Sequence, residues 1–134
     1  MSETVPLSVL LEHLKWHLQR MLEDQSKGRT IYFRDAALQR FEFTFQSALK
    51  CIQHAAGSRL KQNESPETIL NLALQEGWLP QDTDCASLVA SLENMNPDHR
   101  QQHAEAIYDQ LPDCYTRFKF LMDQLCRLSV SDPK

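Results

Sequence analysis

Apolar side chains recur every three or four positions through segment 34–52, which is the pattern of a helix packed against other elements. Phe43 points almost the opposite way, with Ala36 behind it. A helix with large apolar groups on two sides needs cover on both, either from neighbouring helices or from another subunit. We therefore expect segment 34–52 to be the central helix. Its main apolar face is made by Leu38, Phe41, Phe45, Ala48, Leu49 and Ile52.

The same spacing predicts a first helix that begins near Pro6 and fades around Asp24. Val9 and Trp16 lie away from its apolar face, which indicates either a peripheral Trp partly covered by a loop or a contact with a partner or a second copy. The central helix that follows is expected to end near Gly57, because glycine readily takes the left-handed conformation that stops a helix. The apolar face of the first helix is made by Leu7, Leu10, Leu11, Leu14, Leu18 and Met21.

A third, short helix is predicted from Ser65 and Pro66, because serine caps a helix and proline suits its first position. Gly77 closes this helix, and segment 78–80 is an apolar turn expected to pack over one end of the bundle. Segment 82–84 offers caps for a fourth helix. The apolar face of the fourth helix is made by Cys85, Leu88, Val89 and Leu92.

Asn96 and Pro97 resemble the cap and first residue of a fifth helix, and Pro112 forces a kink or a break in it. No segment has the alternation of a strand, and nothing repeats internally. The expected fold is therefore all-α, a single domain over residues 1–134 forming an antiparallel up-and-down bundle of four to five main helices. The last helix carries Tyr115, Phe118, Leu121, Met122, Leu125 and Leu128 at core spacing.

Composition narrows the function classes. The 134 residues carry a net charge of -4, which argues against a protein that coats nucleic acid by bulk electrostatics. No segment approaches the roughly 20 apolar residues needed to cross a bilayer, so no membrane partner is expected. The four cysteines form no C-x-x-C pair and follow no signal peptide, so we interpret them as reduced thiols of a cytoplasmic protein.

Two pairs of histidines have the spacing of one helical turn, His13 with His17 and His99 with His103. Such a pair is able to share a metal, but neither has the Glu of the zinc protease motif and no third ligand is indicated. The alternative is two partly exposed polar residues on a helix flank. We expect that alternative, and therefore no metal and no cofactor.

Charged residues also lie at the edge of the central helix's apolar face. Arg34 and Glu42 each need a partner there, because an unpaired buried charge is costly. One interpretation is an ion pair between helices. The other is a functional cleft lined by Arg34, Arg40 or Glu42.

The strongest polar cluster is segment 94–103, N-M-N-P-D-H-R-Q-Q-H, at the junction of two helices. A helix start with exposed amides, an Arg and two His is able to hold a phosphate or an RNA backbone. The alternative is an ordinary capped turn. The chain has neither a glycine-rich phosphate loop nor a G-x-S-x-G motif.

Segment 34–45, R-D-A-A-L-Q-R-F-E-F-T-F, with Ala48 and Lys50 after it, resembles the signature of the nucleotidyltransferase substrate-binding proteins, a branch of the HEPN superfamily. The resemblance extends over nearly the whole chain. Its further parts are Ser65 with Pro66, Ala73 with Gly77, segment 91–94 and segment 106–108.

This resemblance implies a helical bundle that forms a homodimer and works beside a small, separately encoded nucleotidyltransferase. Many such pairs behave as toxin and antitoxin, with the HEPN member as the toxin. Active HEPN ribonucleases carry an Arg followed, after four to six residues, by a His. Here Met95 and Asn96 stand where Arg-Asn is expected, His99 is the counterpart of the motif His or Tyr, and no His has an Arg five to seven positions ahead of it.

We therefore favour a non-catalytic subunit that binds a nucleotide or RNA beside the nucleotidyltransferase. The alternative is a divergent ribonuclease toxin that uses His99 and His103 as its catalytic groups, with Arg100, from both subunits of a dimer. A third class is a purely structural interaction module. The residues assigned to nucleotide or RNA binding are Asn96, His99, Arg100, His103, Arg34, Arg40 and Glu42.

Overall fold

The computed structural model describes residues 6–25, 31–61, 63–95 and 100–131. These ranges hold five α-helices and no strand, so the predicted all-α bundle is confirmed. The helices are α1 (Leu7–Gln25), α2 (Ile31–Ala56), α3 (Pro66–Gln75), α4 (Cys85–Glu93) and α5 (Arg100–Ser131), with a short 3-10 turn, η1 (Gly57–Arg59), after α2.

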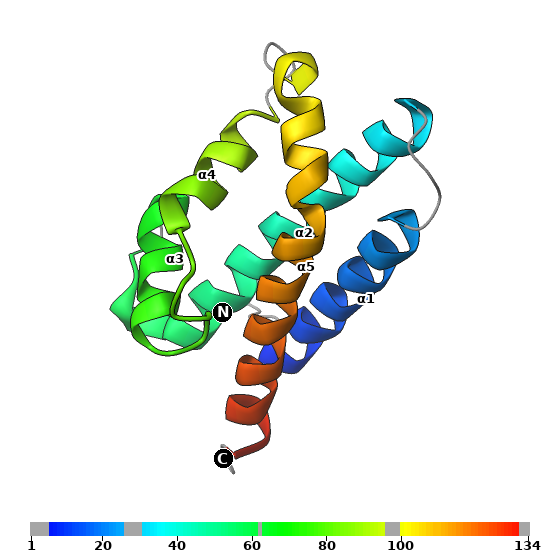
Figure 1. The fold of residues 1–134 in the computed structure, drawn as a ribbon. Helices are drawn as coiled ribbons and strands as arrows, with labels where there is room; N and C mark the ends of the chain where they lie inside the picture. The colour runs from blue at the N-terminus through cyan, green and yellow to red at the C-terminus, as the bar shows by residue number, and fades with distance from the viewer. Residues whose placement is uncertain (1–5, 26–30, 62, 96–99, 132–134) are drawn as a thin grey trace.

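The three long helices form the body of the bundle. α1 and α2 run antiparallel to each other, and α5 crosses and packs against both (Figure 1). Three buried aromatic rings join α2 to α5: the rings of Phe41 and Phe45 meet edge to face at 5.8 Å between centroids, and those of Phe45 and Phe118 at 5.3 Å. α2 also contacts α3, so it is the central helix that the apolar pattern predicts.

The second apolar side of α2, which carries Ala36 and Phe43, is not buried as the first side is. The side chain of Phe43 is 46% exposed and meets His17 of α1, whereas Ala36 is exposed, so the described helices cover this side only in part. Cover from a neighbouring helix, the first of the two alternatives, is therefore incomplete. Cover by another subunit stays a prediction.

The two short helices begin as their sequences predict, and α3 ends before Gly77 as expected. The hydroxyl of Ser65 accepts a hydrogen bond from the backbone N–H of Thr68 at 3.2 Å, and the carboxylate of Asp84 accepts one from Ser87 at 3.1 Å. Gly57 after α2 and Gly77 after α3 have φ of 60° and 83°, the left-handed region that only glycine adopts without strain. These capped ends fix the lengths of α2, α3 and α4.

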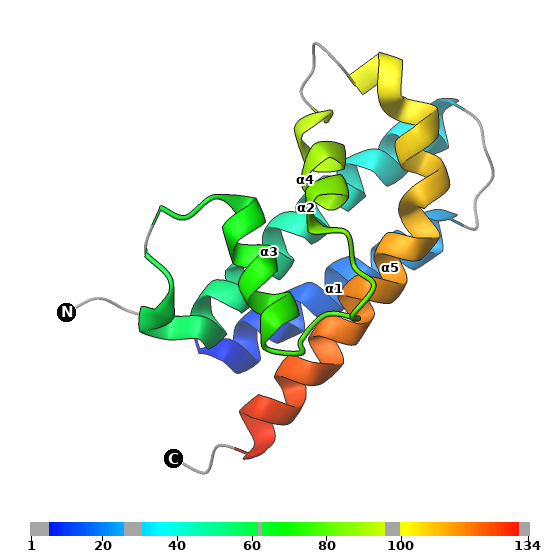
Figure 2. The same cartoon turned by 60° about the vertical axis from the view of Figure 1, so that its left-hand side comes forward.

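One prediction about the last part of the chain needs correction. Pro112 does not separate two helices, because α5 continues through it from Arg100 to Ser131. Figure 2 shows α5 as one continuous helix, so Pro112 does not end it. Leu111 and Cys114 are buried on either side of Pro112, and packing of both halves favours one continuous helix over the local cost of proline. The expected start at Asn96 and Pro97 lies outside the described residues.

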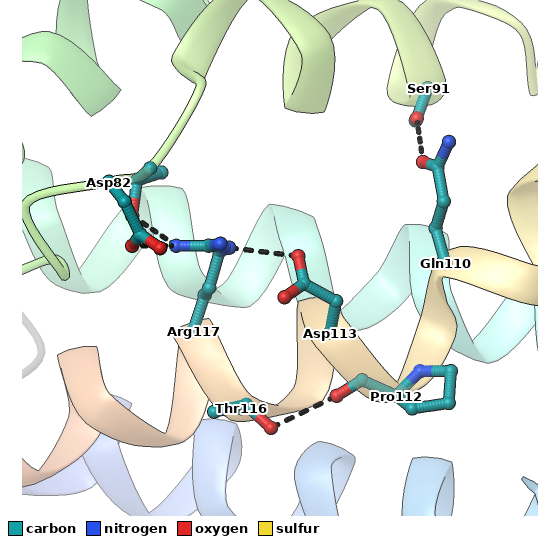
Figure 3. Close-up of polar contacts among 8 residues, drawn as sticks. Asp82, Ser91, Gln110, Pro112, Asp113, Thr116 and Arg117 are labelled. Carbon is teal, nitrogen blue, oxygen red and sulfur yellow. Dashed lines mark hydrogen bonds and ion pairs between the residues drawn. The ribbon is translucent and has the colours of Figure 1, made fainter.

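Polar contacts tie α5 to α4 and to the loop before it (Figure 3). The guanidinium of Arg117 donates to Asp113 at 2.8 Å on its own helix, and at 2.9 Å to both Asp82 and Thr83 in the loop. The hydroxyl of Ser91 on α4 donates to Gln110 at 3.0 Å. The loop and α4 are thus held on the side of α5.

Candidate functional site

Arg34, in the first turn of α2, is bound to α5. Its guanidinium donates to the carboxylate of Glu105 at 2.7 Å, and a second nitrogen lies 3.5 Å from Asp35. The hydrogen bond with Glu105 raises the pKa of Arg34. The ion pair between helices that we expected for Arg34 is therefore present, and its charge is already neutralised by protein carboxylates.

The predicted polar cluster at the start of α5 is only partly described. Asn96 and His99 lie outside the described residues, and Arg100 is the first residue of α5. His103 is half-buried one turn further along, two positions before Glu105. His103 and Arg34 therefore lie at the same end of the bundle.

Arg40 and Glu42 belong to other parts of α2. The guanidinium of Arg40 lies over the indole ring of Trp16 on α1, at 5.1 Å from the ring centroid. Glu42 is half-buried on α2. Arg34 and His103 thus lie at one end of the bundle, and Arg40 lies at the surface shared by α1 and α2.

That shared surface is hollowed. A cavity of about 410 Å³, open on one side, lies between the two helices. Its walls come from Leu10, His13 and His17 of α1 and from Phe43, Gln46, Ser47 and Lys50 of α2. We call these seven residues the α1–α2 groove.

Leu10 and Phe43 are the apolar residues of the groove, and Lys50 is its cationic side chain. No carboxylate is among its seven residues. The pKa of His17 is lowered, first by burial and then by the charges of Arg40, His13 and Lys50, all of which oppose protonation. Basic side chains therefore surround His17 on a chain whose net charge is -4.

His17 is the residue that joins the groove to the exposed tryptophan. Its ring meets the ring of Trp16 at 5.2 Å and that of Phe43 at 6.5 Å. Its Nδ1 is buried and has no hydrogen-bond partner among the described residues. An unsatisfied buried nitrogen is costly, so this atom is a candidate for contact with a bound group.

Metal and thiol chemistry find little support in this part of the chain. Within the described ranges, no group of three or more His, Cys, Asp or Glu side chains is placed to hold a metal ion. All four cysteines are free, and burial raises the pKa of both Cys51 and Cys114 to about 12. No described helix combines the length and the apolar character needed to cross a membrane.

The sequence indicated only part of the groove. The spacing of His13 and His17 and the position of Trp16 off the apolar face mark its α1 wall. On the α2 wall the sequence marked Phe43, as a second apolar side, and Lys50, within the family signature, but it missed Gln46 and Ser47 because they form no motif of their own. They become part of a site only when two antiparallel helices set them opposite α1.

Comparison with known proteins supports the fold and leaves the family open. No family model matches the chain, and no curated protein matches it. A crystal structure of a protein from Thermus thermophilus is similar, with a TM-score of 0.69 and 23% sequence identity, over 84% of this chain and 98% of that one. At this level of identity the likeness shows a shared fold.

Proposed function

We propose that this chain is a non-catalytic, nucleotide-binding or substrate-binding subunit that works in the cytoplasm beside a small nucleotidyltransferase encoded nearby. The two proteins form a pair of the toxin and antitoxin kind, and this chain acts as a homodimer. The proposal rests on the resemblance of segment 34–45 to the nucleotidyltransferase substrate-binding proteins.

The burial and the hydrogen bonds of the signature residues favour a binding subunit over a catalyst. Phe41 and Phe45 are buried in the core, and the buried hydroxyl of Thr44 donates to the carbonyl of Arg40 at 2.7 Å. The guanidinium of Arg34 donates a hydrogen bond to the carboxylate of Glu105. Four residues of the signature therefore support the scaffold, and Arg34 brings no uncompensated charge to a reacting phosphate.

Co-expression tests the proposal. The tagged chain is purified from cells that also express the nucleotidyltransferase encoded next to it, and the mass of each retained chain is measured. We expect a stoichiometric complex that survives gel filtration at micromolar concentration. Recovery of the tagged chain without the nucleotidyltransferase, under conditions in which both are soluble, contradicts the proposal.

A divergent ribonuclease is the second candidate, favoured by the position of His103 in the first turns of α5, at the end of the bundle where Arg34 binds Glu105. In this alternative His99 and His103, with Arg100, act from both subunits on the ribose phosphate. Growth arrest on expression that is abolished by the double substitution His99→Ala and His103→Ala supports it. Absence of RNA cleavage by the pure dimer contradicts it and leaves the binding subunit.

A further inference from the structure

We propose that the α1–α2 groove binds a nucleoside phosphate, with the base against Phe43 and the phosphate toward Lys50 and His13. This deepens the proposed function by giving it a ligand site, and it rests on that function for its biological role. The geometry that carries it belongs to α1 and α2 only. It uses none of the residues at the start of α5.

The charge of the groove favours an anionic ligand. Lys50 is the cationic side chain of the groove, and His13 lies on the facing wall. Because no acidic side chain is among the seven residues, the groove itself offers no carboxylate to Lys50 or His13. A phosphate accepts a charge-assisted hydrogen bond from the ammonium of Lys50 and a hydrogen bond from an imidazole N–H of His13.

The apolar walls select a ligand with a flat ring. Phe43 leaves almost half of its surface in solvent, at 46%, although its ring is part of a hollow that also contains Leu10. A nucleic-acid base stacks on an aromatic side chain, and stacking needs such a partly open ring. Inorganic phosphate leaves these walls exposed, so it does not complete the site.

The antiparallel run of the helices orders these groups along the groove. The ring of His17 lies beside Phe43, so residues earlier in α1 lie beside residues later in α2. Leu10 and Lys50 therefore mark the opposite end, with His13 between the two ends. A ligand with a ring at one end and an anion at the other matches this order.

Size and polar lining agree with a mononucleotide. The cavity of about 410 Å³ falls in the range of roughly 300–1,000 Å³ that small-molecule sites occupy. Gln46 and Ser47 supply an amide and a hydroxyl between the aromatic end and the lysine. Such groups are able to hydrogen-bond a base edge or a ribose hydroxyl.

Titration followed by two-dimensional ¹H–¹⁵N NMR tests this inference on the full chain without any partner. The probes are AMP, UMP, adenosine, ribose 5-phosphate and inorganic phosphate, each raised to millimolar concentration. We expect the monophosphates to shift the amides of residues 10–17 and 43–50. Adenosine, ribose 5-phosphate and inorganic phosphate should bind at least about tenfold more weakly, because each makes either the ring contact or the phosphate contact but not both.

Two variants have matched controls elsewhere on the surface. Lys50→Met and Phe43→Ala should each weaken AMP binding about tenfold, the loss expected for one charge-assisted hydrogen bond or one stacked ring. Lys119→Met and Phe120→Ala change an exposed lysine and an exposed phenylalanine of α5 and should leave it unchanged. The NMR spectrum of each variant shows whether it is folded.

Three outcomes overturn the inference. The first is no shift in segments 10–17 and 43–50 with either monophosphate. The second is equal affinity for AMP and inorganic phosphate. The third is a shift of the same amides on dilution without ligand, which makes the groove a contact between copies of the chain. None of these bears on co-purification with the nucleotidyltransferase, so the proposed function and the site fail separately.

Discussion

The ring of Phe45 on α2 meets the ring of Phe118 on α5 edge to face, with 5.3 Å between the centroids and 71° between the planes. Both side chains are fully buried. Phe118→Ala removes one ring and leaves a cavity between the two longest helices. We expect a loss of about 3–5 kcal/mol in the free energy of unfolding, measured by urea denaturation.

Phe120→Ala is the matched control for that substitution. Phe120 lies two positions further on α5 and is 37% exposed, so its truncation creates no enclosed cavity. Its effect should stay below about 1 kcal/mol. Equal losses for the two variants show that the contact of Phe118 with α2 does not hold the bundle together.

The guanidinium of Arg117 gives a prediction about acid. Its hydrogen bond holds the pKa of Asp82 below its usual value. A carboxyl whose pKa is lowered by folding stabilises the folded state above its unfolded pKa and loses that effect as pH falls through the folded pKa. Arg117→Met should therefore destabilise the protein more at about pH 6 than at about pH 2.5. A destabilisation that is the same at both values means that the ion pairs make no contribution to stability.

His17 gives a prediction of the opposite chemical kind. Burial, Arg40, His13 and Lys50 all lower its pKa, so the folded state resists its protonation. The unfolded chain therefore takes up a proton at His17 before the folded state does. The free energy of unfolding falls as pH drops below 6.5 and through the lowered pKa of His17. Lys50→Met should raise the pKa of His17 in an NMR titration of the imidazole protons, and Lys119→Met should not. A pKa unchanged by Lys50→Met contradicts the charge effect assigned to Lys50.

The thiols should differ in reactivity. Cys126 is half-buried, whereas Cys51 and Cys114 are buried with pKa values raised to about 12, so they hold almost no thiolate near neutrality. Iodoacetamide at about pH 8 should modify Cys126 first and leave Cys51 and Cys114 intact until the protein is unfolded. Mass spectrometry of tryptic peptides measures the order, and early labelling of Cys51 or Cys114 argues against the packing described around them.

Local sequence chemistry was sufficient for most of the fold. Ser65 with Pro66 and the glycines at 57 and 77 act through the nearest few residues, so their roles are readable without tertiary structure. Pro112 was interpreted as a possible break because its local cost is large. The packing of α5 on both sides of it is non-local, and only the structure shows that this packing outweighs the cost.

For the candidate sites too, local features were readable from the sequence and distant partners were not. The charge of Arg34 near an apolar face predicted an ion pair, yet its partner Glu105 is 71 positions away in sequence and could not be named. Arg40 was grouped with Arg34 because both stand in one motif, but they meet different helices, α1 and α5. Proximity in a motif is thus a poor guide to proximity on the surface of a helix, where residues about six apart point in different directions.

The two tryptophans occupy opposite environments, with Trp16 half in solvent beside the groove and Trp78 buried against the bundle. Each also has an arginine guanidinium over its ring, Arg40 at 5.1 Å and Arg59 at 5.7 Å. Fluorescence should therefore separate them, with acrylamide quenching the red-shifted emission of Trp16 and sparing the blue-shifted emission of Trp78. The protein then carries two built-in optical reporters, one for unfolding and one for events at the surface of α1.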